Sequence, residues 1–437
     1  MRFVVEPSAI HSGTVTVPGD KSISHRALML GAIARGDTRI TGFLAGEDCL
    51  ATLAALRALG VSVVREDDTN VTVHGGGKNG LAAPQGPLDL ANSGTAMRLF
   101  AGLLAGQPFS TELVGDESLS RRPMNRVIKP LSMMGAEIGS ADGLPPLRIT
   151  GGRKLGGLVY RLPVASAQVK SAILLAGLYA DGDIAIVEPA VTRDHTERML
   201  RTMGVDVRQG ETQILMRGGQ DLTATDIDVP ADLSSAAFLI LAATIGGGGQ
   251  LTIPGVGVNP TRTGVIDILK KMGANIAVTN VRLYGDEPVA DLVVGPANLR
   301  GIDVDPATVS LAIDEFPVLF VAAACAEGKT TFSGIGELRV KESDRIATMA
   351  EGLRALSVPV DESDDGAVVH GGKIYGGKVN SHGDHRIAMA FAVAATVAEW
   401  SVTIEDTAAV DTSFPGFGDC LRSMGVAITN EGAAGSA

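Results

Sequence analysis

The chain of 437 residues has few aromatic side chains and a deficit of positive charge. Phe, Trp and Tyr make up only 4% of it, so its cores must be built from aliphatic side chains, and nucleic-acid bases would find few stacking partners. The 37 Lys and Arg residues stand against 49 Asp and Glu, which gives a formal net charge of −12. This balance argues against nucleic-acid or anionic-membrane partners. Any anion-binding site must therefore be local.

Cysteines and long apolar runs are also scarce. Cys49, Cys325 and Cys420 lie far apart without a metal-binding or disulfide pattern, which favours a reducing cytoplasm. The first residues lack the apolar core of a signal peptide, and the best apolar run, AAFLILAATI, is too short to cross a bilayer. We therefore expect a cytoplasmic globular protein. Its length indicates two domains of about 200 residues each.

One sequence unit recurs six times along the chain. A helix-like stretch ending in Leu or Met is followed by a turn residue and a short strand, and the turn residues are Gly60, Gly135, Gly204, Gly273, Ser357 and Gly425. Glycine is the residue that a left-handed helix C-terminus prefers. Each copy also begins with a small or polar cap before an apolar helix, and several copies close with a strand that ends in two glycines. The unit is therefore predicted to be strand, helix, strand, helix, strand, strand.

The sixth copy lacks its last strand, whereas the chain opens with an orphan strand, RFVVEP. We infer that the N-terminus completes the sixth unit. Units one to three then form a domain of residues 19–230, and residues 1–18 with 231–437 form the other domain. The hinge is predicted near 18–19 and 230–231. A doubly wound Rossmann-type sheet is the alternative, disfavoured because three signals repeat in phase.

Basic residues gather where the apolar helices begin. In VPGDKSISHRALMLGAIARGD, cations occupy the first turns of a predicted helix, where the helix dipole disfavours them. An anion bound where several helix N-termini converge would compensate. The basic residues at these positions are Lys21, Arg26, Arg98, Lys170 and Arg386. The alternative is that they are ordinary solvated charges.

The sequence contains no segment that fits a known motif for nucleotide or metal binding. PGDKS and EGKTT both fail the spacing of a phosphate-binding loop, so ATP binding is not supported. The two histidines of HGDH, His382 and His385, indicate a polar helix cap more than a metal site.

A second group of charged residues lies in the fifth unit. AIDEFP and RVKESDR supply Asp314, Lys341, Glu342 and Arg345. An acid, a base and cations in one unit suit a proton transfer on an anionic substrate. The alternative is that Asp314 caps the fifth helix and Ser343 opens a capping box, which leaves Lys341 unexplained.

The motifs PGDKSISHRA, NSGTAMR, RRPM, SAQVKSA, DEFP, RVKESDR and GDHRIAMA, in this order, closely resemble those of the 3-phosphoshikimate 1-carboxyvinyltransferase, or EPSP synthase, family. The resemblance covers essentially the whole chain. It implies the α/β enolpyruvyl-transferase fold, an inside-out α/β barrel of two domains with three repeated units each. It also implies transfer of the enolpyruvyl group of phosphoenolpyruvate to the 5-hydroxyl of shikimate 3-phosphate, with release of phosphate. The reaction proceeds by addition and elimination through a tetrahedral intermediate and needs no metal or other cofactor.

The resemblance also implies the site residues. Shikimate 3-phosphate would be bound by Lys21, Ser22, Arg26, Ser166, Ala167, Gln168, Arg193, Asp314 and Lys341. Phosphoenolpyruvate would be held by Lys21, Gly94, Arg122, Gln168, Arg345 and Arg386. Asp314 would accept the hydroxyl proton, Lys341 and Lys21 would assist, and Glu342 would protonate the methylene carbon. We expect a monomer that is open without substrates and closed with them.

Variants of this family differ in their sensitivity to glyphosate. RDHTE, GDKS, SAQVK and NPTR resemble the motifs of the tolerant branch, and Leu99 and Thr412 replace the proline and lysine that are usual in the sensitive branch. Gly94 points the other way, because a well-known tolerant form has alanine there. Glyphosate is thus expected to be a weak inhibitor.

Three rival functions stay open. A UDP-N-acetylglucosamine enolpyruvyltransferase would use a loop cysteine as acid, and none of the three cysteines has the matching context. A nucleic-acid end-processing protein of related architecture is disfavoured by charge and by the scarcity of aromatics. A catalytically inactive phosphometabolite sensor is disfavoured because Asp314 and Glu342 are both present.

Overall fold

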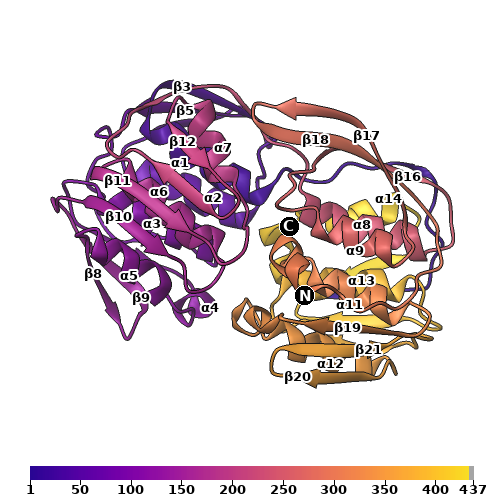
Figure 1. Cartoon of the computed structure of the whole chain (residues 1–437). Coiled ribbons are helices and arrows are strands. Elements are labelled where there is room, and N and C mark those ends of the chain that lie inside the picture. Colours follow the sequence, from indigo (N-terminus) through magenta and orange to yellow (C-terminus); the bar gives the residue numbers. More distant parts are fainter. Residues whose placement is uncertain (433–437) are drawn as a thin grey trace. The chain divides into compact units, whose positions relative to one another are not determined.

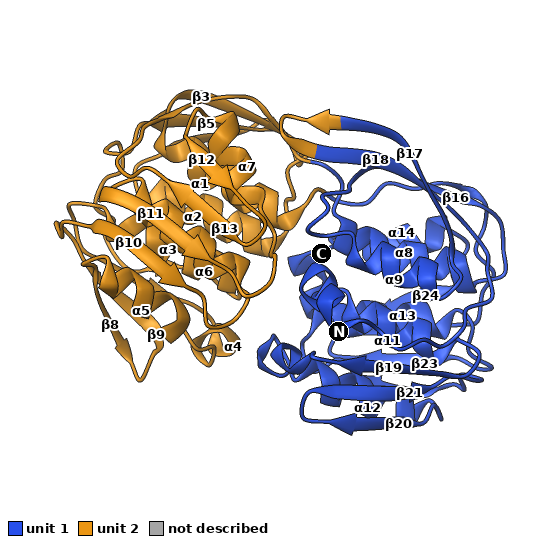
Figure 2. Cartoon of the chain, in the orientation of Figure 1, with its two compact units in different colours: residues 1–18, 230–282, 288–437 blue, residues 19–229, 283–287 orange. Residues whose placement is uncertain are grey.

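The computed structural model describes residues 1–432. The chain divides into two compact units (Figure 2). Unit 1 comprises Met1–Pro18, Pro230–Arg282 and Pro288–Ala437, and unit 2 comprises Gly19–Val229 and Leu283–Glu287. The last segment is the tip of a hairpin whose strands start in unit 1. Within the described part of the chain, no helix has the length and apolarity needed to span a membrane.

Unit 2 contains three sheets with the strand orders β14-β3-β5-β4, β6-β7-β9-β8 and β10-β11-β13-β12 (Figure 1). Its strands are β3 (Ala34–Thr41), β4 (Ser62–Arg65), β5 (Val71–Gly76), β6 (Leu88–Asp89), β7 (Thr111–Val114), β8 (Glu137–Ala141), β9 (Leu144–Thr150), β10 (Gly156–Arg161), β11 (Asp181–Val187), β12 (Val207–Gln209), β13 (Gln213–Met216), β14 (Leu222–Thr223) and β15 (Ile227–Asp228). Its helices are α1 (Lys21–Ile33), α2 (Glu47–Ala58), α3 (Gly94–Ala105), α4 (Glu117–Ser120), α5 (Asn125–Met133), α6 (Ala167–Gly177) and α7 (His195–Thr202).

Unit 1 also contains three sheets, with the orders β17-β18-β16-β2, β19-β21-β20 and β22-β23-β1-β24. Its strands are β1 (Arg2–Val5), β2 (Gly13–Thr14), β16 (Leu251–Gly257), β17 (Asn275–Tyr284), β18 (Glu287–Gly295), β19 (Lys329–Ser333), β20 (Val360–Ser363), β21 (Gly366–His370), β22 (Gly377–Asn380), β23 (Val402–Glu405) and β24 (Ile428–Glu431). Its helices are α8 (Leu233–Ile245), α9 (Gly264–Lys271), α10 (Val309–Ala312), α11 (Phe316–Ala324), α12 (Arg345–Ala355), α13 (His385–Ala395) and α14 (Phe417–Ser423), with the 3₁₀ turns η1 (Pro306–Thr308), η2 (Gly336–Val340) and η3 (Ala408–Thr412).

The sheets share one topology, except that in the fifth unit isolated parallel bridges at Arg300 and Asp303 replace the first strand. In the third unit, for example, β10 is parallel to β11, and β13 pairs antiparallel with both β11 and β12. Helix α6 joins β10 to β11, and α7 joins β11 to β12. This is the strand, helix, strand, helix, strand, strand unit that the repeats predicted. Strand β1 lies between β23 and β24, antiparallel to both, so the prediction that the N-terminus completes the sixth unit is confirmed.

The first helix of each unit is buried along nearly its whole length. In α8 every residue from Leu233 to Thr244 is buried, and α13 is buried from end to end. Aliphatic and small side chains let such helices pack closely. A Cβ placed on Gly102 of α3 would lie 2.1 Å from the carbonyl oxygen of Ala172 in α6, so only glycine permits this approach. The composition, rich in Gly and poor in aromatics, follows from these tight contacts.

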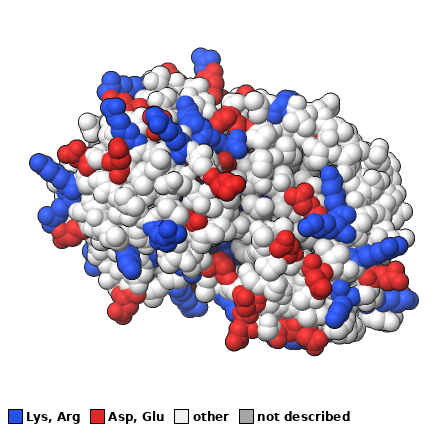
Figure 3. Space-filling model, in the orientation of Figure 1, with Lys and Arg blue, Asp and Glu red and all other residues white. Residues whose placement is uncertain are grey.

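Charged side chains of both signs are interspersed on the face of the molecule shown in Figure 3. Acidic and basic groups both occur over the whole of this face, so neither sign covers it alone.

All six predicted turn residues adopt the left-handed backbone. Their φ angles lie between 66° and 106° at Gly60, Gly135, Gly204, Gly273, Ser357 and Gly425. Ser357, with φ of 66°, is the single residue among them that has a Cβ. Among these six turns, only the turn of the fifth unit therefore carries the steric strain that a Cβ causes in the left-handed conformation.

We expect Ser357→Gly to raise the free energy of unfolding by about 0.5 to 1 kcal/mol, because relief of left-handed strain exceeds the added backbone entropy of the unfolded chain. Denaturant unfolding measures the change. The converse control is Gly204→Ala, where φ is 89° and no atom lies within 4 Å of the added Cβ, so strain alone should lower stability by about 1 kcal/mol. Equal stabilities of Ser357→Gly and the parent chain would contradict the argument.

Candidate active site

The N-termini of α1, α3 and α6 lie together in unit 2. Asp20, Ser93 and Ser166 are their N-cap residues, and each side chain accepts a hydrogen bond from a backbone N–H in the first turn. His25 Nε2 lies 3.4 Å from Ser93 Oγ, which joins α1 to α3. Gln168 Nε2 donates to Thr95 Oγ1 at 2.9 Å, which joins α6 to α3. Three sets of helix N-terminal N–H groups thus share one region, as an anion site needs.

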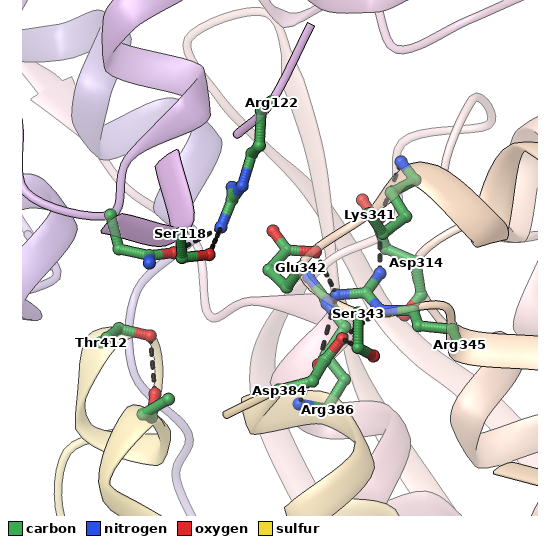
Figure 4. A network of polar contacts seen from close by, with 12 residues as sticks. Ser118, Arg122, Asp314, Lys341, Glu342, Ser343, Arg345, Asp384, Arg386 and Thr412 are labelled. Carbon is green, nitrogen blue, oxygen red and sulfur yellow. Dashed lines mark hydrogen bonds and ion pairs between the residues drawn. The ribbon is translucent and has the colours of Figure 1, made fainter. Parts of the chain in front are cut away.

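A glycine shapes this region. Gly94 is the first residue of α3, and a Cβ there would lie 3.0 Å from Arg98 Nη1 and 3.2 Å from Arg122 Nη1. Its absence lets two guanidinium groups approach the start of the helix. Arg98 Nη1 donates to Gln168 Oε1 at 2.7 Å, and Arg122 Nη2 donates to Asn92 Oδ1 at 2.6 Å. In Figure 4, Arg122 lies beside Ser118, to whose Oγ it donates at 3.3 Å.

Lys21, the first residue of α1, has a carboxylate partner. Its Nζ lies 3.0 Å from Asp48 Oδ2, and both side chains are largely buried, at 18% and 10% exposure. Asp48 therefore offsets part of the unfavourable interaction between Lys21 and the helix dipole, without any bound anion. A ligand is therefore not the only source of this compensation, and an ion pair that spans 27 positions leaves no local signal in the sequence.

His25 carries no charge at neutral pH. Its side chain is fully buried, Nδ1 lies 2.8 Å from Thr52 Oγ1, and burial lowers its pKa from 6.5 to about 3. The start of α1 therefore carries the two cations Lys21 and Arg26, not three.

This histidine should make stability depend on pH. Between pH 6.5 and 3 the unfolded chain binds a proton at His25 that the folded chain does not, so the free energy of unfolding falls as pH decreases through this range. From pH 6.5 to 5 the loss from this group is about 2 kcal/mol. His25→Asn should remove that part of the pH dependence, as measured by denaturant unfolding at both pH values. The exposed His74, changed to Asn, is the control and should leave the dependence intact. Parallel profiles for the His25 variant and the parent would contradict the prediction.

Arg26 is a buried cation held by neutral oxygens. Its guanidinium donates to Thr196 Oγ1 at 2.7 Å, to Ser171 Oγ at 2.9 Å and to the Ser22 carbonyl at 2.9 Å. Burial lowers its pKa to about 10, so it stays protonated at neutral pH. A buried positive charge whose hydrogen bonds go to neutral groups is poised to bind an anion.

Lys170 does not belong with these cations, and the prediction that placed it there is wrong. Its side chain is fully buried, and Nζ lies 3.0 Å from Glu188 Oε2 and 2.8 Å from Glu197 Oε1. It also donates to the Thr192 carbonyl at 3.4 Å. Burial opposes the charge of Lys170, but Glu197 and Glu188 raise its pKa above the usual value. Lys170 therefore fixes the segment between β11 and α7.

The remaining predicted residues of unit 2 lie at the same helix starts. Ser22 is the second residue of α1, Ala167 is the first of α6, and both are partly exposed. Arg193 lies in the segment that Lys170 anchors, two residues before α7. Its charge acts on Arg26, whose pKa it lowers after the larger effects of burial and the nearby carboxylates.

In unit 1 the charged residues of the fifth repeat surround Arg345 (Figure 4). Arg345 is buried, and its guanidinium lies between three carboxylates. Nε donates to Asp384 Oδ2 at 2.8 Å, Nη2 to Glu342 Oε2 at 2.6 Å and Nη1 to Asp314 Oδ1 at 3.4 Å. Lys341 Nζ lies 3.4 Å from the same Asp314 oxygen. Burial opposes the charge of Arg345, but the three carboxylates together raise its pKa.

The capping interpretation of this group is wrong. Helix α11 begins at Phe316 with Glu315, not Asp314, at the N-cap position. Asp344 caps α12 by accepting from the Ala347 N–H at 3.0 Å, whereas Ser343 donates to Asp384 at 3.2 Å. Asp314 and Lys341 therefore have no capping role that would explain their position.

Asp384 caps α13, which agrees with the interpretation of HGDH as a helix start. It accepts from the Arg386 N–H at 2.9 Å, while Arg386 Nη1 donates to the Asp314 carbonyl at 3.1 Å. Sequence reasoning missed the second role of Asp384, which is to bind Arg345. Over residues 1–432, no cluster of three or more His, Cys, Asp or Glu side chains could hold a metal ion.

Repeated α/β units that gather cations and carboxylates at helix N-termini are typical of an enzyme that acts on small anionic substrates. The profile of the EPSP synthase (3-phosphoshikimate 1-carboxyvinyltransferase) family matches residues 5–421. The chain belongs to this family.

Individual relatives agree. A 3-phosphoshikimate 1-carboxyvinyltransferase of Alkalilimnicola ehrlichii is 58% identical over 439 residues, which cover 100% of this chain and 98% of the relative. One from Acidithiobacillus ferrooxidans is 56% identical over 427 residues, 98% of each chain. The solved structure of EPSP synthase from Acinetobacter baumannii is 50% identical, with a TM-score of 0.88 over 98% of this chain and 100% of that one.

Proposed function

We propose that this chain transfers the enolpyruvyl group of phosphoenolpyruvate to shikimate 3-phosphate, the reaction of its family, with the residues described above. The observation that carries the proposal is the position of Asp314, whose carboxylate lies between Lys341 and Arg345 within reach of both. A base flanked by two cations can take a hydroxyl proton while an anionic substrate is held beside it.

Shikimate 3-phosphate is assigned mainly to unit 2. The buried Arg26 and the partly exposed Arg193 supply charge for its phosphate, and the first turn of α6 supplies N–H groups. The residues proposed to bind it are Lys21, Ser22, Arg26, Ser166, Ala167, Gln168 and Arg193, with Asp314 and Lys341.

Phosphoenolpyruvate is assigned to Lys21, Gly94, Arg122, Gln168, Arg345 and Arg386. The guanidinium groups suit its carboxylate and phosphate because they can donate two parallel hydrogen bonds. Four hydrogen bonds to carboxylates use four of the five N–H groups of the Arg345 guanidinium, so a substrate that binds through Nη2 displaces Glu342. That release frees Glu342 for its own part in the reaction.

The addition step forms a bond between the 5-oxygen of the acceptor and C2 of phosphoenolpyruvate. Asp314 takes the hydroxyl proton, Glu342 gives a proton to the methylene carbon, and Lys341 and Lys21 stabilise the developing negative charge. In the elimination step, the bond between C2 and the phosphate oxygen breaks, the leaving phosphate takes the proton from Asp314, and the methyl carbon returns a proton to Glu342, which restores the double bond and both carboxyl groups. The segments near 18–19 and 230–231 are proposed to act as the hinge for closure of the two domains.

A phosphate-release assay tests the proposal. Release from phosphoenolpyruvate should require shikimate 3-phosphate, and neither shikimate nor UDP-N-acetylglucosamine should replace it. Phosphate release with UDP-N-acetylglucosamine as the one effective acceptor would support the UDP-N-acetylglucosamine enolpyruvyltransferase function instead. No release with any acceptor would favour a catalytically inactive phosphometabolite sensor. The molar mass measured by light scattering during turnover tests the prediction that the protein is a monomer.

Glyphosate should inhibit weakly, which is the finer proposal that the RDHTE and NPTR motifs support. We expect an inhibition constant at least about tenfold above the KM for phosphoenolpyruvate, a difference of about 1.4 kcal/mol in binding. Steady-state inhibition against phosphoenolpyruvate measures it. An inhibition constant close to that KM would reject tolerance without touching the assigned reaction.

A further inference from the structure

Arg262 links two helix N-termini of unit 1. It lies just before α9, and its side chain is 4% exposed. Nη2 donates to Asp232 Oδ1, at the N-cap of α8, at 3.2 Å and to Ser234 Oγ, in the first turn of α8, at 2.7 Å. The same nitrogen lies 3.7 Å from Oε1 of Glu315, at the N-cap position of α11.

Glu315 is a buried carboxylate between two guanidinium groups. It is 1% exposed, and its Oε1 accepts a hydrogen bond from Ser234 Oγ. This oxygen also lies 3.9 Å from Arg386 Nη1. Its other oxygen, Oε2, is buried and has no hydrogen-bond partner among residues 1–432. Within this part of the chain, only one of the two Glu315 carboxylate oxygens therefore accepts a hydrogen bond.

An incompletely paired buried carboxylate is drawn to the nearest cation, because the low-polarity interior strengthens the attraction. Arg262 supplies that charge from one side. Without it, the nearest guanidinium to Glu315 is Arg386, which the structure holds instead on the Asp314 carbonyl at 3.1 Å. A rotated Glu315 could then pair with Arg386 through both of its oxygens.

We propose that Arg262 is a positioning residue for Arg386: by neutralising Glu315, it keeps the Arg386 guanidinium available to the substrate. This rests on the proposed binding of phosphoenolpyruvate by Arg386. Arg262 touches neither substrate, and it acts only through Glu315. The NPTR segment that carries it thereby acquires a physical role in the site.

The test is a double-mutant cycle on the whole chain. Arg262→Met should raise the KM for phosphoenolpyruvate by about 10- to 100-fold, the effect of losing one charged hydrogen bond. The KM for shikimate 3-phosphate should stay within about twofold. Adding Glu315→Gln should return the KM for phosphoenolpyruvate to within about threefold of the parent value, because the competing charge is gone while the Ser234 hydrogen bond is kept. Because Glu315→Gln would also relieve the structural cost of an unpaired buried carboxylate, the rescue is read together with the KM for shikimate 3-phosphate, which a general structural defect would raise as well.

Controls separate the possible failures. Arg354→Met removes another arginine of unit 1, which donates to the Val360 carbonyl at the far end of α12, and should leave both KM values unchanged. Arg386→Met must raise the KM for phosphoenolpyruvate; if it does not, the proposed function of Arg386 fails. If it does and Arg262→Met does not, the positioning role alone is overturned.

Glu315→Gln by itself keeps the inference testable should Arg262→Met not fold. It should leave the KM for phosphoenolpyruvate unchanged or lower it. A rise of tenfold or more would show that the carboxylate assists binding, which overturns the inference.

Discussion

Asp314→Asn should lower the turnover number by about 10²- to 10⁴-fold, the range that a positioned general base contributes. The substitution keeps the size of the side chain and one oxygen that can accept from Lys341 and Arg345, but the amide has no basic site for the hydroxyl proton. KM values for both substrates should change much less than the turnover number, because the charge matters most when the proton moves. Phosphate release at saturating substrates measures the effect.

The fold should survive this change. Arg345 would keep the carboxylates of Asp384 and Glu342, at 2.8 and 2.6 Å, which are its shorter hydrogen bonds. The matched control is Asp361→Asn in the same unit, an exposed carboxylate paired with His370, which should leave turnover unchanged. Turnover within threefold of the parent chain for Asp314→Asn would remove Asp314 as the base and shift attention to Glu342.

Much of the fold could be predicted because its signals are local. A left-handed turn residue, a helix cap and a pair of glycines are each set by a few neighbouring residues, and their repetition in phase exposed the six units. Even Ser357, the one turn residue of the six that is not glycine, was predicted from the spacing of the repeats, and it adopts a φ of 66°. The orphan N-terminal strand was placed by the same reasoning, since a unit with a missing strand must obtain it from elsewhere in the chain.

The charged pairs could not be predicted in this way. Lys21 and Lys170 both lie in the first turn of the first helix of a unit, yet Lys170 is buried between Glu188 and Glu197 while Lys21 stays partly exposed beside Asp48. Which lysine faces a ligand depends on contacts between side chains that are 18 to 27 positions apart in the sequence. No local pattern encodes such contacts.

The tip of the hairpin formed by β17 and β18 shows that a domain boundary can also depend on contacts that no local pattern encodes. Residues 283–287 connect strands that begin and end in unit 1, but they pack as part of unit 2. Asp286 accepts from Arg201 Nη2 at 2.9 Å, and Glu287 Oε1 lies 2.7 Å from His195 Nδ1. The repeat pattern, which treats each unit as one piece, contains no signal for this exchange.

The second large effect is expected at Arg26. Arg26→Gln should raise the KM for shikimate 3-phosphate by about 10²- to 10³-fold, because a charge-assisted pair of hydrogen bonds to a phosphate contributes about 3 to 4 kcal/mol where both groups are buried. The KM for phosphoenolpyruvate should change by less than about fivefold, since Arg26 is not among its proposed ligands. Steady-state kinetics with each substrate varied in turn separates the two effects.

Arg26→Gln should weaken substrate binding without lowering the free energy of unfolding. This combination distinguishes a residue that binds substrate from one that stabilises the fold. Burial lowers the pKa of Arg26 from 12.5 to about 10, so the folded chain without substrate bears a penalty on the order of 3 kcal/mol for holding this charge. Glutamine carries no charge and can still hydrogen-bond to Thr196 or Ser171, so Arg26→Gln should unfold at the same denaturant concentration as the parent chain or a higher one. The exposed Arg35, paired with Asp221, supplies the control variant Arg35→Gln, which should change neither quantity. A clear loss of stability in Arg26→Gln with an unchanged KM for shikimate 3-phosphate would show that Arg26 holds the fold together and leaves the substrate's phosphate to other residues.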